Sequence, residues 1–182
     1  SGGASPPTIW QEIRDVLAAR EVLTAYGMSE TTASTTCTLP EGPDERLATS
    51  NGCFKQAGVP GDPALHGSLA LYKTIDPETC ADLPIGMPGE LVARGPIVTR
   101  GYYNKPDETK AAFTHDRWLG TGDVGVVDAD GYLTLTGRIK ETYRCGGEMV
   151  MPREIEEFIG EHPLVGQAFV VGIPDAKMGE VG

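Results

Sequence analysis

The chain begins with apolar residues at helical spacing. Ile9, Ile13 and Leu17 recur every four positions behind a Pro-Pro pair, and proline is tolerated in the first turn of a helix. This pattern predicts a helix from Thr8 to about Ala18. The apolar run Val22–Tyr26 follows and predicts a short buried strand. A polar segment then starts at the carboxyl end of that strand, where α/β sheets usually bind ligands.

Further along, apolar and polar positions alternate as they do in β-strands. In Ser68–Ile75 the residues Leu69, Leu71 and Ile75 fall on one face, and Glu90–Arg94 is a second short β-prone run. Each run is bounded by residues that favour turns. We therefore expect two strands here, with the first one half-buried.

A hairpin and one helix complete this middle region. Val124–Val127 and Tyr132–Thr136 flank Asp128-Ala129-Asp130-Gly131, and Asp-Gly between β-prone runs is a strong hairpin signal. Pro106–Phe113 predicts a helix with proline at its start, whereas Thr38–Ala64 has no sustained period and predicts mostly irregular connections. Many short strands joined by turns indicate a small, distorted barrel or sandwich.

The pattern changes once more after Lys140. Pro152 begins a helical pattern with Ile155 and Phe158 on its apolar face, and Ala168–Ile173 predicts an apolar strand. One helix and one strand in about 40 residues bury too little apolar surface for a core of their own. We expect a domain boundary near Lys140 and a second domain that continues past residue 182.

Composition excludes several classes of function. The 182 residues include 26 acidic and 15 basic side chains, a formal charge of −11, which disfavours a surface for nucleic acid or anionic membranes. No apolar run approaches the roughly 20 residues of a membrane span, so we expect a cytoplasmic protein without one. The four cysteines form no CxxC pair, which favours free thiols in a reducing compartment.

Candidate chemistry gathers in Ala25-Tyr26-Gly27-Met28-Ser29-Glu30-Thr31. An adenine can stack on the Tyr26 ring, Gly27 lets the backbone approach a ligand, and Ser29 and Thr31 can donate to a phosphate. Glu30 is a hard oxygen ligand of the kind that Mg²⁺ takes beside phosphates. The structural alternative is a strand that enters a surface turn with a capped helix behind it.

The wider sequence resembles the adenylate-forming superfamily of acyl- and aryl-CoA ligases, peptide-synthetase adenylation domains and luciferases. The residues that carry the resemblance occur in the family's order: Ser1-Gly2-Gly3-Ala4, Tyr26-Gly27-Met28-Ser29-Glu30, Gly89-Glu90-Leu91, Gly101-Tyr102-Tyr103-Asn104, Trp118-Leu119-Gly120-Thr121-Gly122-Asp123, Gly137-Arg138-Ile139-Lys140, Gly146-Gly147-Glu148 and Pro152-Arg153-Glu154-Ile155-Glu156. The resemblance implies a mixed α/β and β fold. Residues 1–139 would end a large AMP-binding domain, with the end of its α/β part at 1–37 and a distorted small β-barrel at about 50–139. Residues 140–182 would begin a mobile α/β cap.

The family's reaction uses ATP, a carboxylic acid and CoA as substrates. The acid attacks the α-phosphate to give an acyl adenylate, and the CoA thiol then displaces AMP. The resemblance implies that Gly3 and Ala4 meet the adenine edge while Tyr26 stacks on its face beside Gly27. It makes Ser29 a catalytic donor to the α-phosphate and Glu30 the catalytic ligand of Mg²⁺.

The same resemblance assigns the later motifs. Asp123 and Arg138 would hold the ribose hydroxyls, Lys140 would be the hinge, and Gly146 and Gly147 would approach the pantetheine arm of CoA. Each assignment has a structural alternative: Asp123 as a turn residue, Arg138 as a solvated charge, Lys140 as an exposed linker residue and the glycines as an ordinary hairpin turn.

Some family features are absent or altered in the sequence. Met149 stands where Asn is usual, Gly120 stands where a basic residue is usual, and the chain holds neither a Gly-rich phosphate loop ending in Lys nor the late cap lysine. We therefore expect an internal fragment of a longer ligase, inactive by itself. A carrier-protein-loading adenylation domain and a non-catalytic nucleotide-binding or scaffold protein remain alternatives.

Overall fold

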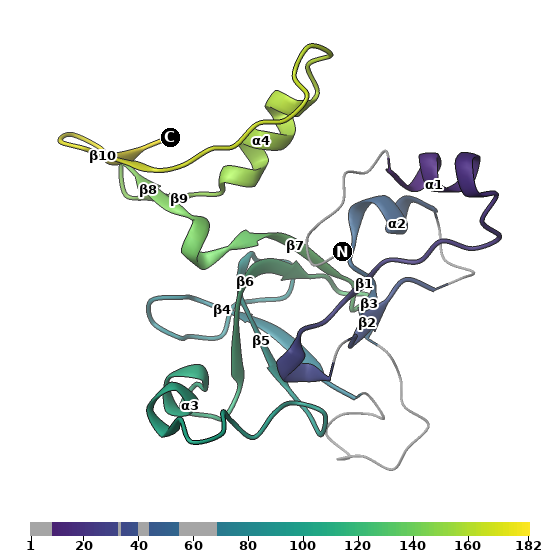
Figure 1. Ribbon diagram of the computed structural model, residues 1–182. Helices are drawn as coiled ribbons and strands as arrows, with labels where there is room; N and C mark the ends of the chain where they lie inside the picture. The colour runs from purple at the N-terminus through teal and green to yellow at the C-terminus, as the bar shows by residue number, and fades with distance from the viewer. Residues whose placement is uncertain (1–8, 33, 40–43, 55–68) are drawn as a thin grey trace. The chain divides into compact units, whose positions relative to one another are not determined.

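The computed structural model describes residues 9–32, 34–39, 44–54 and 69–182 (Figure 1). Two compact units account for the chain. The first comprises Ser1–Thr121 and Gly125–Leu135, and the second comprises Gly122–Val124 and Thr136–Gly182. Among the described residues, no helix has both the length and the apolar composition that crossing a membrane requires.

The first unit opens with helix α1 (Ile9–Leu17), as the apolar spacing predicted. A small antiparallel sheet follows in the order β1-β2-β3, made of β1 (Ala25–Tyr26), β2 (Thr36–Cys37) and β3 (Cys53–Phe54). The strand predicted at Val22–Tyr26 is therefore only two residues long. Its partner β2 comes from a threonine-rich segment for which the sequence pattern predicted no strand.

The prediction of irregular structure from Thr38 to Ala64 is wrong in part. Helix α2 (Asp44–Thr49) and strand β3 lie in this range, while 40–43 and 55–64 lie outside the described residues. The short strand forms because Cys53 stands opposite Cys37 in the antiparallel register, so a distant partner supplies its hydrogen bonds. All four cysteines are free thiols, and burial raises the pKa of Cys53.

A second antiparallel sheet, ordered β4-β5-β6-β7, forms most of the core. Its strands are β4 (Leu71–Ile75), β5 (Gly89–Arg94), β6 (Leu119–Val127) and β7 (Leu133–Arg138). The predicted strands are confirmed, but the predicted inner face of β4 is confirmed only at Ile75, which is 2% exposed. Ala70 and Tyr72 join the core cluster, whereas Leu71 is only half-buried, because the Tyr72 ring packs edge-to-face on Tyr26.

The β6–β7 hairpin turn is held from two directions. The Asp128 carboxylate accepts backbone hydrogen bonds from Asp130 and Tyr132, both at 2.9 Å, and Gly131 has a positive φ of 80°. From α2, the Arg46 guanidinium binds Asp128 at 2.7 Å and Asp130 at 3.0 Å, and lies 4.4 Å from the centre of the Tyr132 ring. The predicted hairpin is thus confirmed, with a clamp that the sequence pattern did not indicate.

Helix α3 (Pro106–Ala112) connects β5 to β6 and is confirmed as predicted. Pro106 stands at its start, where a missing N–H costs nothing, and Asp107 and Glu108 in the first turn favour the positive end of the helix dipole. A hydrogen bond from Lys105 holds the pKa of Glu108 below its ordinary value.

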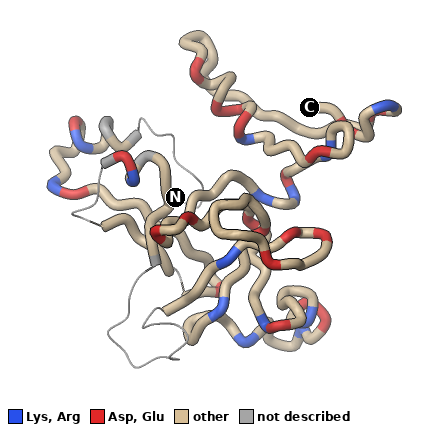
Figure 2. Tube along the Cα trace, turned by 180° about the vertical axis from the view of Figure 1, so that it is seen from behind, with Lys and Arg blue, Asp and Glu red and all other residues tan. Residues whose placement is uncertain are grey.

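The second unit contains a four-stranded antiparallel sheet ordered β10-β11-β8-β9. The helices and strands of this unit are η3 (Ile139–Glu141), β8 (Tyr143–Cys145), β9 (Glu148–Val150), α4 (Pro152–Gly160), β10 (Ile173–Asp175) and β11 (Gly179–Val181). Helix α4 is confirmed, with acidic positions along it (Figure 2). The strand predicted at Ala168–Ile173 is wrong except at Ile173, where β10 begins. The N–H of Val170 binds the Glu156 side chain at 2.8 Å instead of a neighbouring strand.

Candidate functional site

The turn after β1 borders a pocket of about 420 Å³. The pocket is lined by Ala25, Tyr26, Gly27, Met28, Ser29 and Ser34. Ser29 begins the single 3₁₀ turn η1 (Ser29–Thr31), and both Gly27 and Ser29 are exposed. The segment that the sequence marks for nucleotide chemistry therefore faces an open pocket.

Thr31 fixes the shape of this turn. Its side chain is fully buried, and its hydroxyl accepts a hydrogen bond from the Met28 N–H and donates one to the Met28 carbonyl, both at 3.1 Å. The prediction that Thr31 donates to a phosphate is therefore wrong, because its donor is already used inside the turn. Because the Thr31 side chain points inward, Ser29 stays exposed and Glu30 half-buried.

Tyr26 belongs both to the core and to the pocket wall. It is 7% exposed, and its ring meets Tyr72 edge-to-face with the centroids 5.8 Å apart. The Tyr72 hydroxyl lies 2.7 Å from that of Thr35, while the Tyr26 N–H donates to the Thr36 hydroxyl at 3.0 Å. The ring is thus fixed by packing, and a flat ligand would meet it without reordering it.

Glu30 is half-buried and is held at both its backbone and its side chain. Its carbonyl accepts from Thr99 N–H at 2.7 Å, and its Oε1 accepts from the Tyr102 hydroxyl at 3.0 Å. The bond to the Glu30 carboxylate, aided by partial burial, raises the pKa of the Tyr102 hydroxyl. Nearby, the Thr32 hydroxyl donates to the Ile97 carbonyl at 3.1 Å.

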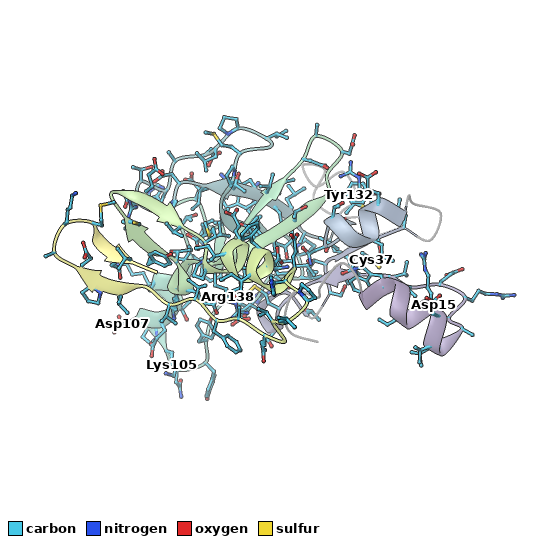
Figure 3. All side chains as sticks on the ribbon, turned by 90° about the horizontal axis from the view of Figure 1, so that it is seen from above. Asp15, Cys37, Lys105, Asp107, Tyr132 and Arg138 are labelled. Carbon is cyan, nitrogen blue, oxygen red and sulfur yellow. The ribbon has the colours of Figure 1, made fainter. Side chains whose placement is uncertain are left out.

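Asp123 and Arg138 form an ion pair in the second unit. Asp123 lies within β6 and is 8% exposed, whereas Arg138 ends β7 and has a side chain that is 60% exposed. Arg138 is labelled in Figure 3. The Arg138 Nε is 3.1 Å from Asp123 Oδ1. Asp123 is therefore a strand residue and not a turn residue. The structure brings together the two residues that the sequence assigned to one ribose.

The remaining predicted residues in the second unit lie at turns. Lys140 is exposed in η3, and Gly146 and Gly147 form the β8–β9 turn with φ values of 63° and 92°. Gly146 N–H donates to the Met178 carbonyl at 2.8 Å, and a Cβ at this position would lie 2.8 Å from the Met178 methyl carbon. The glycines are thus required by the turn itself. Gly3 and Ala4 lie outside the described residues.

The predicted residues form two groups. Tyr26, Ser29 and Glu30 lie in the first unit, and Asp123, Arg138 and Lys140 in the second. Within the described residues, no group of three His, Cys, Asp or Glu side chains could hold a metal ion. Glu30 alone, with substrate phosphates, is nevertheless a donor set of the kind that Mg²⁺ uses.

Sequence reasoning gave no role to Tyr102 or Thr99. Both contact Glu30, about 70 positions away, so no local spacing could reveal the contact. The one available signal was Gly101-Tyr102-Tyr103-Asn104, which we noted as a motif without a function.

Comparisons with known proteins agree on one family. The family described as AMP-binding enzyme matches residues 1–103. The medium-chain acyl-CoA ligase ACSF2 of Danio rerio, described as mitochondrial, is 35% identical over 180 residues, which are 99% of this chain and 28% of that protein. The chain spans less than a third of the length of the curated relatives that it matches first.

Solved structures are similar as well. ATP-bound MatB from Rhodopseudomonas palustris has a TM-score of 0.73 and 36% identity, over 87% of this chain and 29% of that chain. The o-succinylbenzoate CoA synthetase MenE from Bacillus subtilis, in complex with an acyl-adenylate intermediate, has a TM-score of 0.79 and 29% identity over 99% of this chain and 34% of that chain. These similarities confirm the predicted mixed α/β and β fold.

Proposed function

Because the chain belongs to the AMP-binding enzyme family, as its motifs predicted, we propose that the full-length protein is an ATP-dependent carboxylic acid:CoA ligase. The observation that carries this proposal is the η1 turn, which buries Thr31, places Ser29 in the wall of the pocket together with Tyr26, and has Glu30 as the next residue along the chain. An adenylate-forming site needs a hydroxyl donor at the α-phosphate, a carboxylate for the metal ion beside the phosphates, and an aromatic ring against the adenine.

In the first half-reaction, an oxygen of the substrate carboxylate attacks the α-phosphorus of ATP, and the bond to pyrophosphate breaks. Negative charge builds on the α-phosphate oxygens, where the Ser29 hydroxyl donates. Tyr26 supports the adenine face, with Gly27 beside it, and Gly3 and Ala4 meet the adenine edge. Asp123 and Arg138 hold the ribose hydroxyls, and the Arg138 Nε also lies 3.1 Å from Asp123 Oδ1.

Glu30 is the residue proposed to hold Mg²⁺. Its carboxylate is half-buried, and the Tyr102 hydroxyl already orients one of its oxygens, which suits a metal bound by one protein carboxylate and by phosphates. When bound, Mg²⁺ supplies positive charge that offsets the charge of the phosphates.

In the second half-reaction, the CoA thiolate attacks the acyl carbonyl carbon and AMP leaves. Gly146 and Gly147 carry no side chain, so the β8–β9 turn lets the pantetheine arm come close to the backbone. Lys140, exposed in η3, is the proposed hinge between the large AMP-binding domain and the mobile cap. We place that domain boundary between residues 139 and 140.

Isotope exchange of pyrophosphate into ATP tests the first step. The full-length protein, screened with fatty, aromatic, dicarboxylic and amino acids, should show exchange that depends on at least one acid. Absence of acid-dependent exchange with every acid tested would favour a non-catalytic nucleotide-binding protein. With the active acid, thioester formation on CoA supports the ligase, whereas formation only on a phosphopantetheinyl carrier protein would indicate a carrier-loading domain.

The cytoplasm is the proposed location, because the four cysteines are free thiols of the kind that persist in a reducing compartment. Cell fractionation of the native protein checks this. Recovery with a membrane or organelle fraction would contradict it.

A further inference from the structure

The segment before α3 is tied to the Glu30 turn at two points. Thr99 N–H donates to the Glu30 carbonyl at 2.7 Å, and the Tyr102 hydroxyl donates to Glu30 Oε1 at 3.0 Å. The first bond fixes the backbone of Glu30 and the second fixes its side chain. Two residues of one segment therefore determine both where Glu30 lies and how its carboxylate is turned.

Tyr102 is itself held firmly enough to act in this way. Its N–H donates to the Thr109 hydroxyl at 2.8 Å, and its carbonyl accepts from Lys105 N–H at 3.2 Å. Gly101 makes this approach possible, because it has a φ of 145° and a Cβ there would lie 2.3 Å from the Thr109 methyl group. The backbone of Tyr102 is thus anchored at the start of α3, which fixes the point from which its side chain reaches Glu30.

The neighbouring tyrosine shows that the contact is specific. Tyr103 is 91% exposed, whereas Tyr102 is 39% exposed and donates a hydrogen bond from its hydroxyl to the Glu30 carboxylate. The two side chains have the same chemistry and adjacent positions. Only one of them reaches the carboxylate, so Tyr103 provides a matched control.

We propose that Tyr102 is a positioning residue for the divalent cation, which holds Glu30 Oε1 so that the second carboxylate oxygen is presented to the metal. This inference rests on the proposed function, because it needs Glu30 as the metal ligand. A carboxylate that is already oriented loses less rotational freedom when it binds a cation, and partners of metal ligands commonly affect metal affinity tenfold or more. Tyr102 acts through Glu30 and touches no reacting atom.

Manganese binding measures this effect without turnover. In the full-length protein with bound ATP, the electron paramagnetic resonance signal of free Mn²⁺ gives the metal affinity. Tyr102→Phe should weaken it roughly tenfold, because the ring stays but the donor is lost. Tyr103→Phe should match the wild type. Equal affinities for Tyr102→Phe and the wild type would overturn the proposal.

Glu30→Gln separates this inference from the proposed function. If Glu30→Gln leaves Mn²⁺ affinity unchanged, the metal assignment of Glu30 is wrong, and the role of Tyr102 falls with it even where acid-dependent exchange persists. Absence of acid-dependent exchange in the wild type tests the ligase proposal separately.

The Mg²⁺ dependence of pyrophosphate exchange provides a second readout. Tyr102→Phe should raise the Mg²⁺ concentration for half-maximal rate by about the same factor and leave the rate at saturating Mg²⁺ nearly unchanged. A lowered rate at every Mg²⁺ concentration, with an unshifted midpoint, would mean that Tyr102 only supports the fold and would overturn the proposal.

Discussion

The Asp123 carboxylate is nearly buried, yet its partner Arg138 is mostly exposed. Asp123 therefore depends on its environment for orientation, while Arg138 can lose its partner and remain solvated. This asymmetry makes Asp123 the better position for testing the proposed ribose contact, because a change there removes the bond without leaving an uncompensated buried charge.

Asp123→Asn should weaken AMP binding roughly ten- to a hundredfold, since hydrogen bonds to a charged group contribute about 1.5–3 kcal/mol. Titration calorimetry with the full-length protein measures the affinity. The control ligand is 2′,3′-dideoxy-AMP, which lacks both ribose hydroxyls and should lose little on the same substitution. An equal loss for both ligands would show that Asp123 does not bind the ribose.

Single residues differed in how far the sequence could predict them. Ser29 and Glu30 could be found because they lie in one short motif, and in η1 the structure leaves Ser29 exposed and Glu30 half-buried. Thr31 has the same hydroxyl chemistry as Ser29, but burial redirects it to the backbone. Burial and long-range contacts, such as the bond from Tyr102 to Glu30, arise only in the folded chain. They therefore leave no pattern among neighbouring residues of the sequence.

Among the elements, β7 is joined to the β1 turn through Asn51. The Asn51 Oδ1 accepts from Leu135 N–H at 2.9 Å, and its N–H donates to the Leu133 carbonyl at 2.6 Å. The Asn51 carbonyl accepts at 2.6 Å from the Thr36 hydroxyl, which itself accepts from Tyr26 N–H. Through its backbone and its side chain, this one residue connects the strand that leads to Arg138 with the backbone of the candidate adenine platform.

Asn51→Leu should lower the free energy of unfolding by about 1–3 kcal/mol, because the Leu135 N–H would lose its acceptor. Asn51→Asp has nearly the same shape and keeps an acceptor oxygen, so it should retain most of the stability. Urea unfolding followed by tryptophan fluorescence measures both. Similar losses for the two variants would mean that the side-chain bond contributes little.

The hairpin clamp predicts a dependence on pH. Burial opposes ionisation of Asp128, but hydrogen bonds from Tyr132 N–H, Arg46 and Asp130 N–H outweigh it and hold the pKa of Asp128 below its ordinary value. The stabilisation is therefore complete above the unfolded-state pKa of about 3.9 and is lost as the pH falls through the lowered folded-state pKa.

Asp128→Asn should destabilise the protein at neutral pH, and the difference from the wild type should shrink below about pH 4. Urea unfolding at a series of pH values gives this curve. Asp130→Asn is the matched control, because Asp130 binds the same Arg46 but its side chain is 73% exposed, and exposed ion pairs contribute little. A difference for Asp128→Asn that persists unchanged at low pH would contradict the ionic origin.

Elements with strong local signals could be predicted, and those that depend on partners could not. Helices α3 and α4 begin with proline, and the β6–β7 hairpin is marked by Asp-Gly. The two-residue strands β2 and β3 exist only through pairing with distant segments, β2 with both β1 and β3, and β3 with β2. The apolar run at Ala168–Ile173 has the composition of a strand, but the Val170 N–H within it donates to the Glu156 side chain instead of to a neighbouring strand.

At the scale of the whole molecule, the proposed function requires the cap to pivot near Lys140. Lys140→Pro fixes φ at that position and restricts Ile139 before it. The full-length variant should therefore form the adenylate at a near-normal rate but lose thioester formation on CoA. Parallel assays of pyrophosphate exchange and thioester yield measure the two steps, with Lys140→Ala as the control for the side chain. Equal loss of both steps would indicate that the junction unfolds.

The ion pair between Asp123 and Arg138 also bears on how a nucleotide reaches the protein. The two charges lie 3.1 Å apart and largely cancel at a distance, so they do little against the repulsion between a triphosphate and a chain of net charge −11. Dissolved salt screens that repulsion beyond a Debye length of about 8 Å at physiological ionic strength, but it hardly reaches contacts to a partly buried carboxylate. Ionic strength therefore governs how readily the phosphate end arrives, while the retention of the neutral sugar is largely independent of it.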